Sequence, residues 1–196
     1  YEVNFITNKN GIISYGDQNK NQILVIGDSF STDPYVSTNK MWYSIFADNL
    51  KNLDKLNVNI KVVGAGGYGT FQQYLLLERL KEKLDPKFII FQFCSNDLEN
   101  NNLNLEKING SINQYSRRPY FKDNKIIYSD NFLSKLLRLK FVGESRIINK
   151  FFFMLYKNEK KKFLETDLKN ARKITLNLLK KIREIFPEKD YYIFNC

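Results

Sequence analysis

Four short apolar runs, each rich in β-branched or aromatic residues, constrain the fold of this chain most. Runs of this kind are typical of strands that are covered on both faces of a sheet. They lie at 22–26, 59–63, 87–93 and 191–195. Patterns with one apolar helical face lie between them, at 42–56, 71–84 and 164–186. This order of strands and helices predicts an α/β fold with a parallel sheet and helices on both of its faces.

The stretch 98–159 is less regular than the rest of the chain. Its parts 100–104 and 109–118 are predicted to be loops, and 132–139 and 147–156 are predicted to be short helices. The whole stretch follows the carboxyl end of a predicted strand. Segments in that position often shape a substrate pocket.

The composition is ordinary for a soluble globular protein, with 43% hydrophobic and 27% charged residues. No run of about 18 apolar residues is present, so the sequence predicts no membrane-spanning helix. The net charge of +10 would suit an anionic partner. Because the lysines are spread along the chain without interleaved aromatic residues, we expect no nucleic-acid site.

The two ends of the chain carry their own expectations. The first residue is Tyr1, and the last, Cys196, closes an apolar run that predicts a strand. Because domains rarely stop inside a core strand, we expect residues 1–196 to be one domain whose last elements follow Cys196. The sequence leaves open whether a signal peptide or anchor preceded Tyr1, and whether the compartment is the bacterial cell envelope or the cytoplasm.

Cysteine usage argues against a disulfide framework of the kind that small secreted domains use, because the chain has only two cysteines. Cys94 lies in a predicted buried strand, where we expect it to act as a small hydrophobic residue. The chain has no histidine and no paired-cysteine motif, so we expect no zinc site and no cofactor.

A serine follows directly on the first predicted strand, in the sequence Gly27-Asp28-Ser29. A turn from strand to helix would expose its side chain above the sheet and turn its backbone N–H toward the same space, where it can stabilise an oxyanion. The pattern therefore makes Ser29 a candidate nucleophile, with Gly27 and Asp28 in support. The alternative is a plain helix cap or polar turn, and Ser31 stands where the nucleophile elbow has its second glycine.

A glycine-rich turn at 64–70 follows the second predicted strand and leads into a helix. Backbone amides in such a turn can bind an oxyanion or a phosphate. The turn also matches the Gly-x-Gly-x-x-Gly pattern of dinucleotide sites. That fingerprint belongs after the first strand and needs an acid about 20 residues on, whereas Asp97 is further away.

Asn96 follows the third predicted strand and can donate its side-chain N–H to an oxyanion without bringing in charge. Taken alone, it is as well explained as a loop start or a helix cap. Ser29, the glycine turn and Asn96 all follow predicted parallel strands, at the edge where open α/β sheets bind ligands. We therefore expect them to form one site.

These motifs, Gly27-Asp28-Ser29-Phe30, Gly67-Tyr68-Gly69-Thr70 and Asn96-Asp97, resemble the SGNH (GDSL-type) superfamily of esterases and lipases. The segment Arg118-Pro119-Tyr120-Phe121 is similar to a further family segment. The resemblance implies a flavodoxin-like three-layer α/β/α sandwich that hydrolyses or transfers acyl esters.

By position in the family motifs, the resemblance implies that Ser29 is the nucleophile. It also implies an oxyanion hole made by the N–H groups of Ser29 and Gly67 and the side chain of Asn96. The family takes its base from an Asp-x-x-His motif near the C-terminus. No such motif is present in these residues, and we expect it beyond residue 196.

The sequence thus predicts a serine-dependent ester hydrolase that is inactive or weak over these residues, since no histidine is present. Its substrate would be a small-molecule or glycan acyl ester. One alternative is an O-acyltransferase that uses the same residues on a cell-envelope glycan, and another is a non-catalytic binding domain that lacks the base. Association with a membrane or the envelope, and the oligomeric state, stay open.

Overall fold

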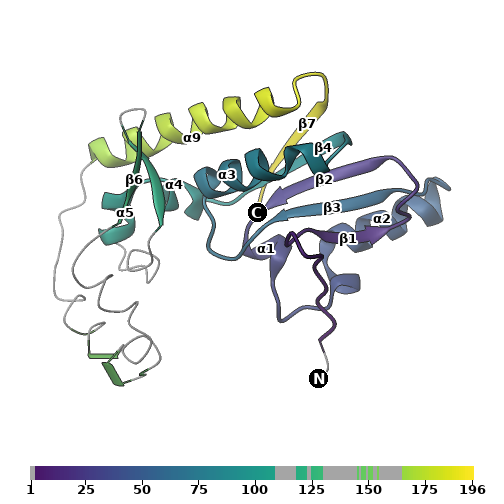
Figure 1. Ribbon diagram of the computed structural model, residues 1–196, viewed down its shortest axis with the longest axis horizontal. Helices are drawn as coiled ribbons and strands as arrows, with labels where there is room; N and C mark the ends of the chain where they lie inside the picture. Colours follow the sequence, from purple (N-terminus) through teal and green to yellow (C-terminus); the bar gives the residue numbers. More distant parts are fainter. Residues whose placement is uncertain are drawn as a thin grey trace. The chain divides into compact units, whose positions relative to one another are not determined.

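The computed structural model describes residues 3–108, 118–122, 125–129, 145, 147–148, 150–151, 154 and 165–196. The chain divides into two compact units, which are described separately (Figure 1). Unit 1 consists of residues 1–97 and 177–196, and unit 2 consists of residues 98–176. The expectation that residues 1–196 form one domain stays a prediction.

Unit 1 is built on a five-stranded, mostly parallel sheet (Figure 1). Its strands are β1 (Ile13–Gly16), β2 (Gln22–Gly27), β3 (Asn59–Gly64), β4 (Pro86–Phe93) and β7 (Asp190–Asn195). They lie in the order β1-β3-β2-β4-β7, and β1 alone among these strands runs antiparallel to its neighbour. The four predicted strands are confirmed, but the expectation that all are covered on both faces is wrong for β7, a largely exposed strand at the edge of the sheet. The short edge strand β1 was not predicted.

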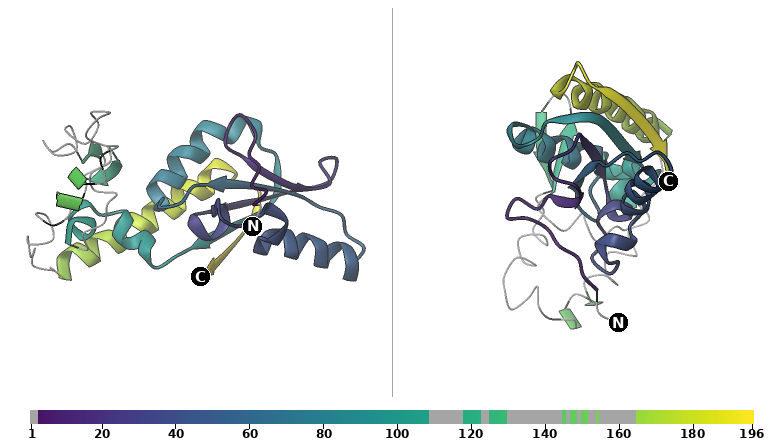
Figure 2. Two further views of the ribbon diagram at one scale, coloured as in Figure 1. Left: turned by 90° about the horizontal axis from the view of Figure 1, so that it is seen from below. Right: turned by 90° about the vertical axis from the view of Figure 1, so that its right-hand side faces the viewer.

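Helices pack on both faces of this sheet, as the sequence predicts (Figure 2). Successive residues of β2 point to opposite faces, since side chains alternate along a strand. Leu24 and Ile26 pack with the core that contains α3 (Thr70–Leu80) and the C-terminal part of α9 (Glu165–Ile185). Ile23 and Val25 pack with the core that contains α2 (Trp42–Leu53). This arrangement is compatible with a three-layer α/β sandwich.

The other helical segments of unit 1 are short. They are α1 (Ser29–Thr32), η1 (Thr38–Lys40) and η2 (Lys81–Lys83). The predicted helix 71–84 is confirmed as α3 continued by the 3-10 turn η2, and the predicted helix 164–186 as α9, with residue 164 outside the described residues. Among the described helices, none combines the length and the apolar character needed to cross a membrane.

The predicted helix 42–56 ends earlier than expected, because α2 stops at Leu53. Lys55 has a φ of 56°, which lies in the left-handed region. The backbone N–H groups of Asp54 and Leu56 both donate to the carbonyl of Leu50 at 3.1 Å. These bonds end the helix with a left-handed cap, a position that usually holds glycine.

Unit 2 contains α5 (Leu103–Ile108) and a hairpin of β5 (Pro119–Lys122) and β6 (Lys125–Tyr128), and α4 (Asn96–Asn100) leads into it. The loop prediction for 100–104 is wrong at both ends, because α4 includes Asn100 and α5 begins at Leu103. Asn102 explains the error. Its side-chain oxygen accepts from the N–H groups of Asn104 and Leu105, so an asparagine-rich run that is typical of loops forms a helix N-cap.

The hairpin of unit 2 is held to α5 by buried polar side chains. Arg118 donates to the carboxylate of Glu106 at 2.9 Å, and the hydroxyl of Tyr120 donates to its other oxygen. The family-like segment 118–121 therefore contributes to the packing of unit 2. Residues 147, 148, 150, 151 and 154 are helical, in agreement with the prediction for 147–156, whereas 132–139 lies outside the described residues.

The left-handed cap at the end of α2 predicts a stabilising substitution. Replacing Lys55 with Gly should raise the free energy of unfolding by about 1 kcal/mol, because a side chain at a left-handed position costs about that much. Urea unfolding measures the change. The matched control is Lys51→Gly inside the last turn of α2, which should instead lower stability by about 1 kcal/mol. A loss of stability in both variants would contradict the assignment of the cap.

Candidate functional site

The carboxyl ends of β2, β3 and β4 meet at one edge of the sheet in unit 1 (Figure 1). Gly27 at the end of β2 is paired with Gly64 at the end of β3. Ser29 begins α1 just beyond β2, and Asn96 begins α4 just beyond β4. The sheet therefore brings the ends that carry the predicted site residues to one edge.

The pair of glycines allows an unusually close approach of backbone at this edge. A Cβ atom added to Gly64 would overlap the carbonyl oxygen of Gly27. A Cβ on Gly27 would lie 2.6 Å from Oγ of Ser31 and 2.7 Å from Oε1 of Gln92. Both positions need glycine for lack of space, which gives the predicted supporting residue Gly27 a steric role.

The glycine turn after β3 lies against Ser29. A Cβ atom placed on Gly66 would be 3.8 Å from Cβ of Ser29, an ordinary van der Waals separation. Gly67 has a φ of 76°, which glycine adopts readily and other residues rarely do. The turn is held to α3 by Gln72, whose side chain accepts from the N–H of Gly69 at 2.9 Å.

Asp28 anchors the turn between β2 and α1. Its carboxyl oxygen Oδ1 accepts from the N–H of Phe30 at 3.1 Å, and its carbonyl accepts from the hydroxyl of Thr32 at 2.7 Å. Asp28 has no exposed surface, whereas Ser29 beside it is partly exposed. The turn thus buries the carboxylate as the N-cap of α1 and leaves the serine partly accessible.

The side chain of Asn96 acts on the same carboxyl group. Burial raises the pKa of Asp28, and hydrogen bonds from the N–H of Phe30 and the side chain of Asn96 oppose that rise. Asn96 is itself exposed. The next residue, Asp97, is fully buried and accepts from the N–H of Cys94 at 3.2 Å. Asn96 therefore lies at the site together with Ser29 and the glycine turn.

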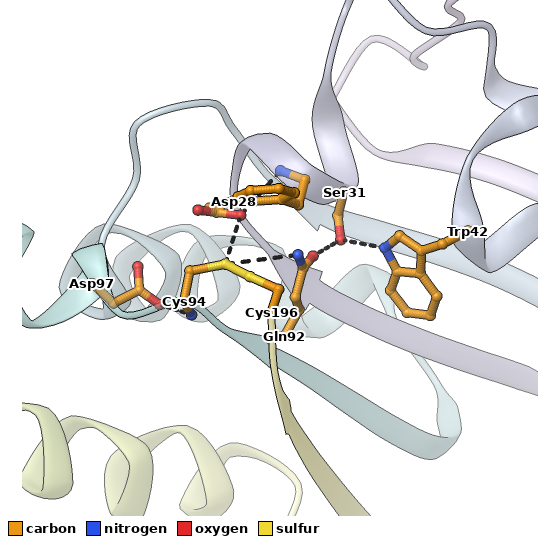
Figure 3. The surroundings of a disulfide bond; sticks show 8 residues. Asp28, Ser31, Trp42, Gln92, Cys94, Asp97 and Cys196 are labelled. Carbon is orange, nitrogen blue, oxygen red and sulfur yellow. Dashed lines mark hydrogen bonds between the residues drawn. A yellow bond between two sulfur atoms is a disulfide. The ribbon is translucent and has the colours of Figure 1, made fainter.

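A buried polar network under α1 was not predicted from the sequence (Figure 3). The indole N–H of Trp42 donates to Oγ of Ser31 at 3.2 Å, and Ser31 donates in turn to Oε1 of Gln92. The ring of Trp42 packs edge-on against Phe194 of β7, with the ring centroids 5.1 Å apart. No local sequence pattern signals this network, because it joins side chains from α1, α2, β4 and β7.

The expectation that Cys94 is an unpaired hydrophobic residue is wrong, because Cys94 and Cys196 form a disulfide (Figure 3). Sγ of Cys94 lies 3.6 Å from Oδ1 of Asp28, the residue that holds the turn between β2 and α1. The sheet register accounts for the pairing. Phe93 on β4 is paired with Asn195 on β7, so the two residues that follow them are also neighbours. The sequence signal for this disulfide is that each cysteine directly follows a strand, Cys94 after β4 and Cys196 after β7.

The chemistry available at this edge is a serine hydroxyl, backbone N–H groups and a neutral amide. Ser29 is the first residue of α1, where a backbone N–H has no partner inside the helix. The neighbouring carboxylates of Asp28 and Asp97 are fully buried, so neither is exposed to a substrate. The described residues contain no cluster of three or more side chains suited to hold a metal ion.

Comparison with known proteins gives no family assignment. No protein-family model matches the chain, and no curated protein matches it. The resemblance to the SGNH superfamily therefore rests on the motifs and on their placement at one edge of the sheet.

The contact between Gly64 and Gly27 predicts a large difference between two neighbouring glycines. Gly64→Ala should lower the free energy of unfolding by about 3 kcal/mol, because the added methyl group has to push β2 and β3 apart. Gly66→Ala, which places its methyl group at van der Waals distance from Ser29, should change stability by no more than about 0.5 kcal/mol. Urea unfolding compares the two, and equal effects would rule out the close approach.

The burial of Asp28 predicts that the free energy of unfolding depends on pH. Because burial raises its pKa above the usual 3.8, the unfolded chain loses this proton at lower pH than the folded protein does. The carboxyl group therefore contributes stability that is present below 3.8 and is lost as pH rises through the folded pKa. Asp28→Asn keeps the acceptor for Phe30 but cannot ionise, so its stability relative to the native protein should increase across this range.

The test is urea unfolding from about pH 4 to pH 7. Asp17→Asn is a matched control, because Asp17 is exposed and also accepts from the N–H two residues ahead, that of Asn19. If the relative stability of Asp28→Asn has the same pH dependence as that of Asp17→Asn, then burial does not raise the pKa of Asp28.

Proposed function

We propose that this chain carries the nucleophile and the oxyanion-stabilising groups of a serine-dependent ester hydrolase of the SGNH type. The observation that carries the proposal is the convergence of three motifs on one sheet edge. The glycine turn lies beside Ser29, and the side chain of Asn96 is close enough to Asp28, which precedes Ser29, to oppose the rise that burial causes in the pKa of Asp28. The motifs come from segments that follow three different strands.

In the proposed reaction, Oγ of Ser29 attacks the carbonyl carbon of an acyl ester. The carbonyl oxygen takes up the negative charge of a tetrahedral intermediate. The N–H groups of Ser29 and Gly67 and the side chain of Asn96 stabilise that charge. A single donor of this kind typically contributes a factor of about 100 to 1,000 in rate. The intermediate then expels the alcohol and leaves Ser29 acylated, and water releases the acid.

The order of the strands supports the finer description of the fold as flavodoxin-like. Taken in chain order, the parallel strands are β2, β3, β4 and β7. Across the sheet they lie in the order β3-β2-β4-β7, which is the order 2-1-3-4 when the strands are numbered along the chain. A flavodoxin-like sheet begins with the same order and binds its ligand at the carboxyl edge.

The proton of Ser29 needs an acceptor. As the family resemblance implies, we place this acceptor outside these 196 residues. The sequence contains no histidine. Asp28 and Asp97 are buried and accept hydrogen bonds from backbone N–H groups. The lack of an imidazole favours a second candidate function, a domain that binds acyl esters without turning them over.

Covalent labelling of Ser29 tests the proposal on the chain as it is. A fluorophosphonate, which reacts with activated serines, should label Ser29 about 100 times faster than Ser95, because oxyanion donors stabilise its transition state. Ser95 is a suitable reference, since it is exposed and lies just after β4. The rate at Ser29 should rise with hydroxide concentration, because no imidazole titrates near neutrality. Peptide mass spectrometry locates the label.

Two variants complete this experiment. Ser29→Ala should abolish the fast label, whereas Ser95→Ala should leave it unchanged. Asn96→Ala should slow labelling of Ser29 by about 100-fold if the amide stabilises an oxyanion. Labelling of Ser29 at the rate of Ser95, with no effect of Asn96→Ala, would sink the ester-hydrolase proposal and favour the binding domain.

A further inference from the structure

We propose that unit 1 has a second binding site, for a small hydroxylated anion such as a sugar phosphate or a sugar acid. The site is a cavity of about 370 Å³, a volume in the range of small-molecule pockets. Gln22 and Asn59, the first residues of β2 and β3, line it, as does Lys189, which precedes β7. It therefore lies where the parallel strands begin, roughly 20 Å from Ser29 along β2.

Positive charge dominates the lining of this cavity. Lys20, Lys87 and Lys189 line it, and of the described residues that do so, Asp85 is the one acid. Nζ of Lys189 is 3.8 Å from the carboxylate of Asp85, but the side chain of Asp85 is fully exposed. An exposed pair of this kind is weak. The excess of lysines therefore favours an anionic ligand.

An irregularity between β2 and β4 explains why the lining includes Lys87. Gln22 is paired with Pro86, and the next residue of β2, Ile23, is paired with Phe88. Lys87 is therefore left without a partner on β2. A bulge of this kind re-aims a side chain and ends regular pairing. Here it places a cation in the wall of the cavity.

Two amides in the wall, the buried Asn59 and the half-buried Gln22, supply the second observation. Asn59 is only 6% exposed, and its Nδ2 donates to the carbonyl of Gln18 at 3.4 Å while its Oδ1 has no hydrogen-bond partner. Nε2 of Gln22 is likewise buried without a partner. Unpaired buried polar atoms are costly and rare. The terminal torsions of these amides are soft, so a small rotation can turn both atoms toward a ligand.

The pairing of these groups defines the chemistry of the ligand. A hydroxyl group can donate to Oδ1 of Asn59 and accept from Nε2 of Gln22. A phosphate or carboxylate can accept from the lysine ammonium groups. A small molecule with both an anionic group and hydroxyl groups fits, whereas a neutral sugar lacks the first and inorganic phosphate lacks the carbon-bound hydroxyls. The site uses no residue of the proposed esterase, so it does not depend on that function.

Isothermal titration at low salt tests the site with four probes: glucose 6-phosphate, glucuronate, glucose and inorganic phosphate. Glucose 6-phosphate or glucuronate should bind saturably and at least about ten times more tightly than glucose, because charge-assisted bonds are lost with glucose. Comparing the affinities of glucose 6-phosphate and glucuronate shows whether the site prefers a phosphate or a carboxylate. Inorganic phosphate should bind more weakly than glucose 6-phosphate, and equal affinity would overturn the role of the amides.

Lysine variants locate the binding. Lys87→Gln and Lys189→Gln should each weaken the binding of the preferred anion by about tenfold. The control, Lys51→Gln, removes an exposed lysine on α2 that does not line the cavity and should leave the affinity unchanged. Circular dichroism verifies that each variant is folded. The proposal is overturned if none of the four probes binds saturably, or if both lining variants bind as the native chain does.

Discussion

The contact between the backbones of Gly27 and Gly64 is the constraint on which the candidate site depends. The last residues of β2 and β3 lie so close that a side chain on Gly64 would overlap the carbonyl of Gly27, while a side chain on Gly27 would meet Ser31 and Gln92. Any larger residue at Gly64 would separate the strand ends and move the following turn away from Ser29. The packing of two strands, rather than a hydrogen bond to the serine itself, therefore sets the position of the glycine turn.

Asp28 joins the remaining parts of this edge. Its buried carboxyl group accepts from the N–H of Phe30 in α1 and lies against the sulfur of Cys94, and the side chain of Asn96 opposes the rise that burial causes in its pKa. Segments that follow β2 and β4 thus meet at one group, and burial gives that group a raised pKa. A carboxylate in this position organises the turn around Ser29 without being exposed to a substrate.

Elements with a strong local signal could be predicted from the sequence. The strands of unit 1 that are apolar on both faces were found, as was the one-sided pattern of α9. The edge strand β1 was missed, because it has only four residues, of which Ile13 alone is buried, and it ends in glycine. The placement of the candidate site residues at one edge of the sheet could be predicted from their position after the strands. The disulfide and the link from Trp42 to Gln92 depend on which strands are neighbours, and that order is not a local property of the sequence.

The disulfide has a topological consequence. Cys94 and Cys196 are 102 residues apart, so the chain between them, unit 2 included, forms a closed covalent ring. A single break of the backbone anywhere in that ring leaves both pieces attached to the sheet. Because the entropy cost of closing a loop grows by only about 0.6 kcal/mol for each doubling of its length, the ring can gain or lose residues with little effect on the sheet. Unit 2 is thus free to change in size while the edge that carries Ser29 stays the same.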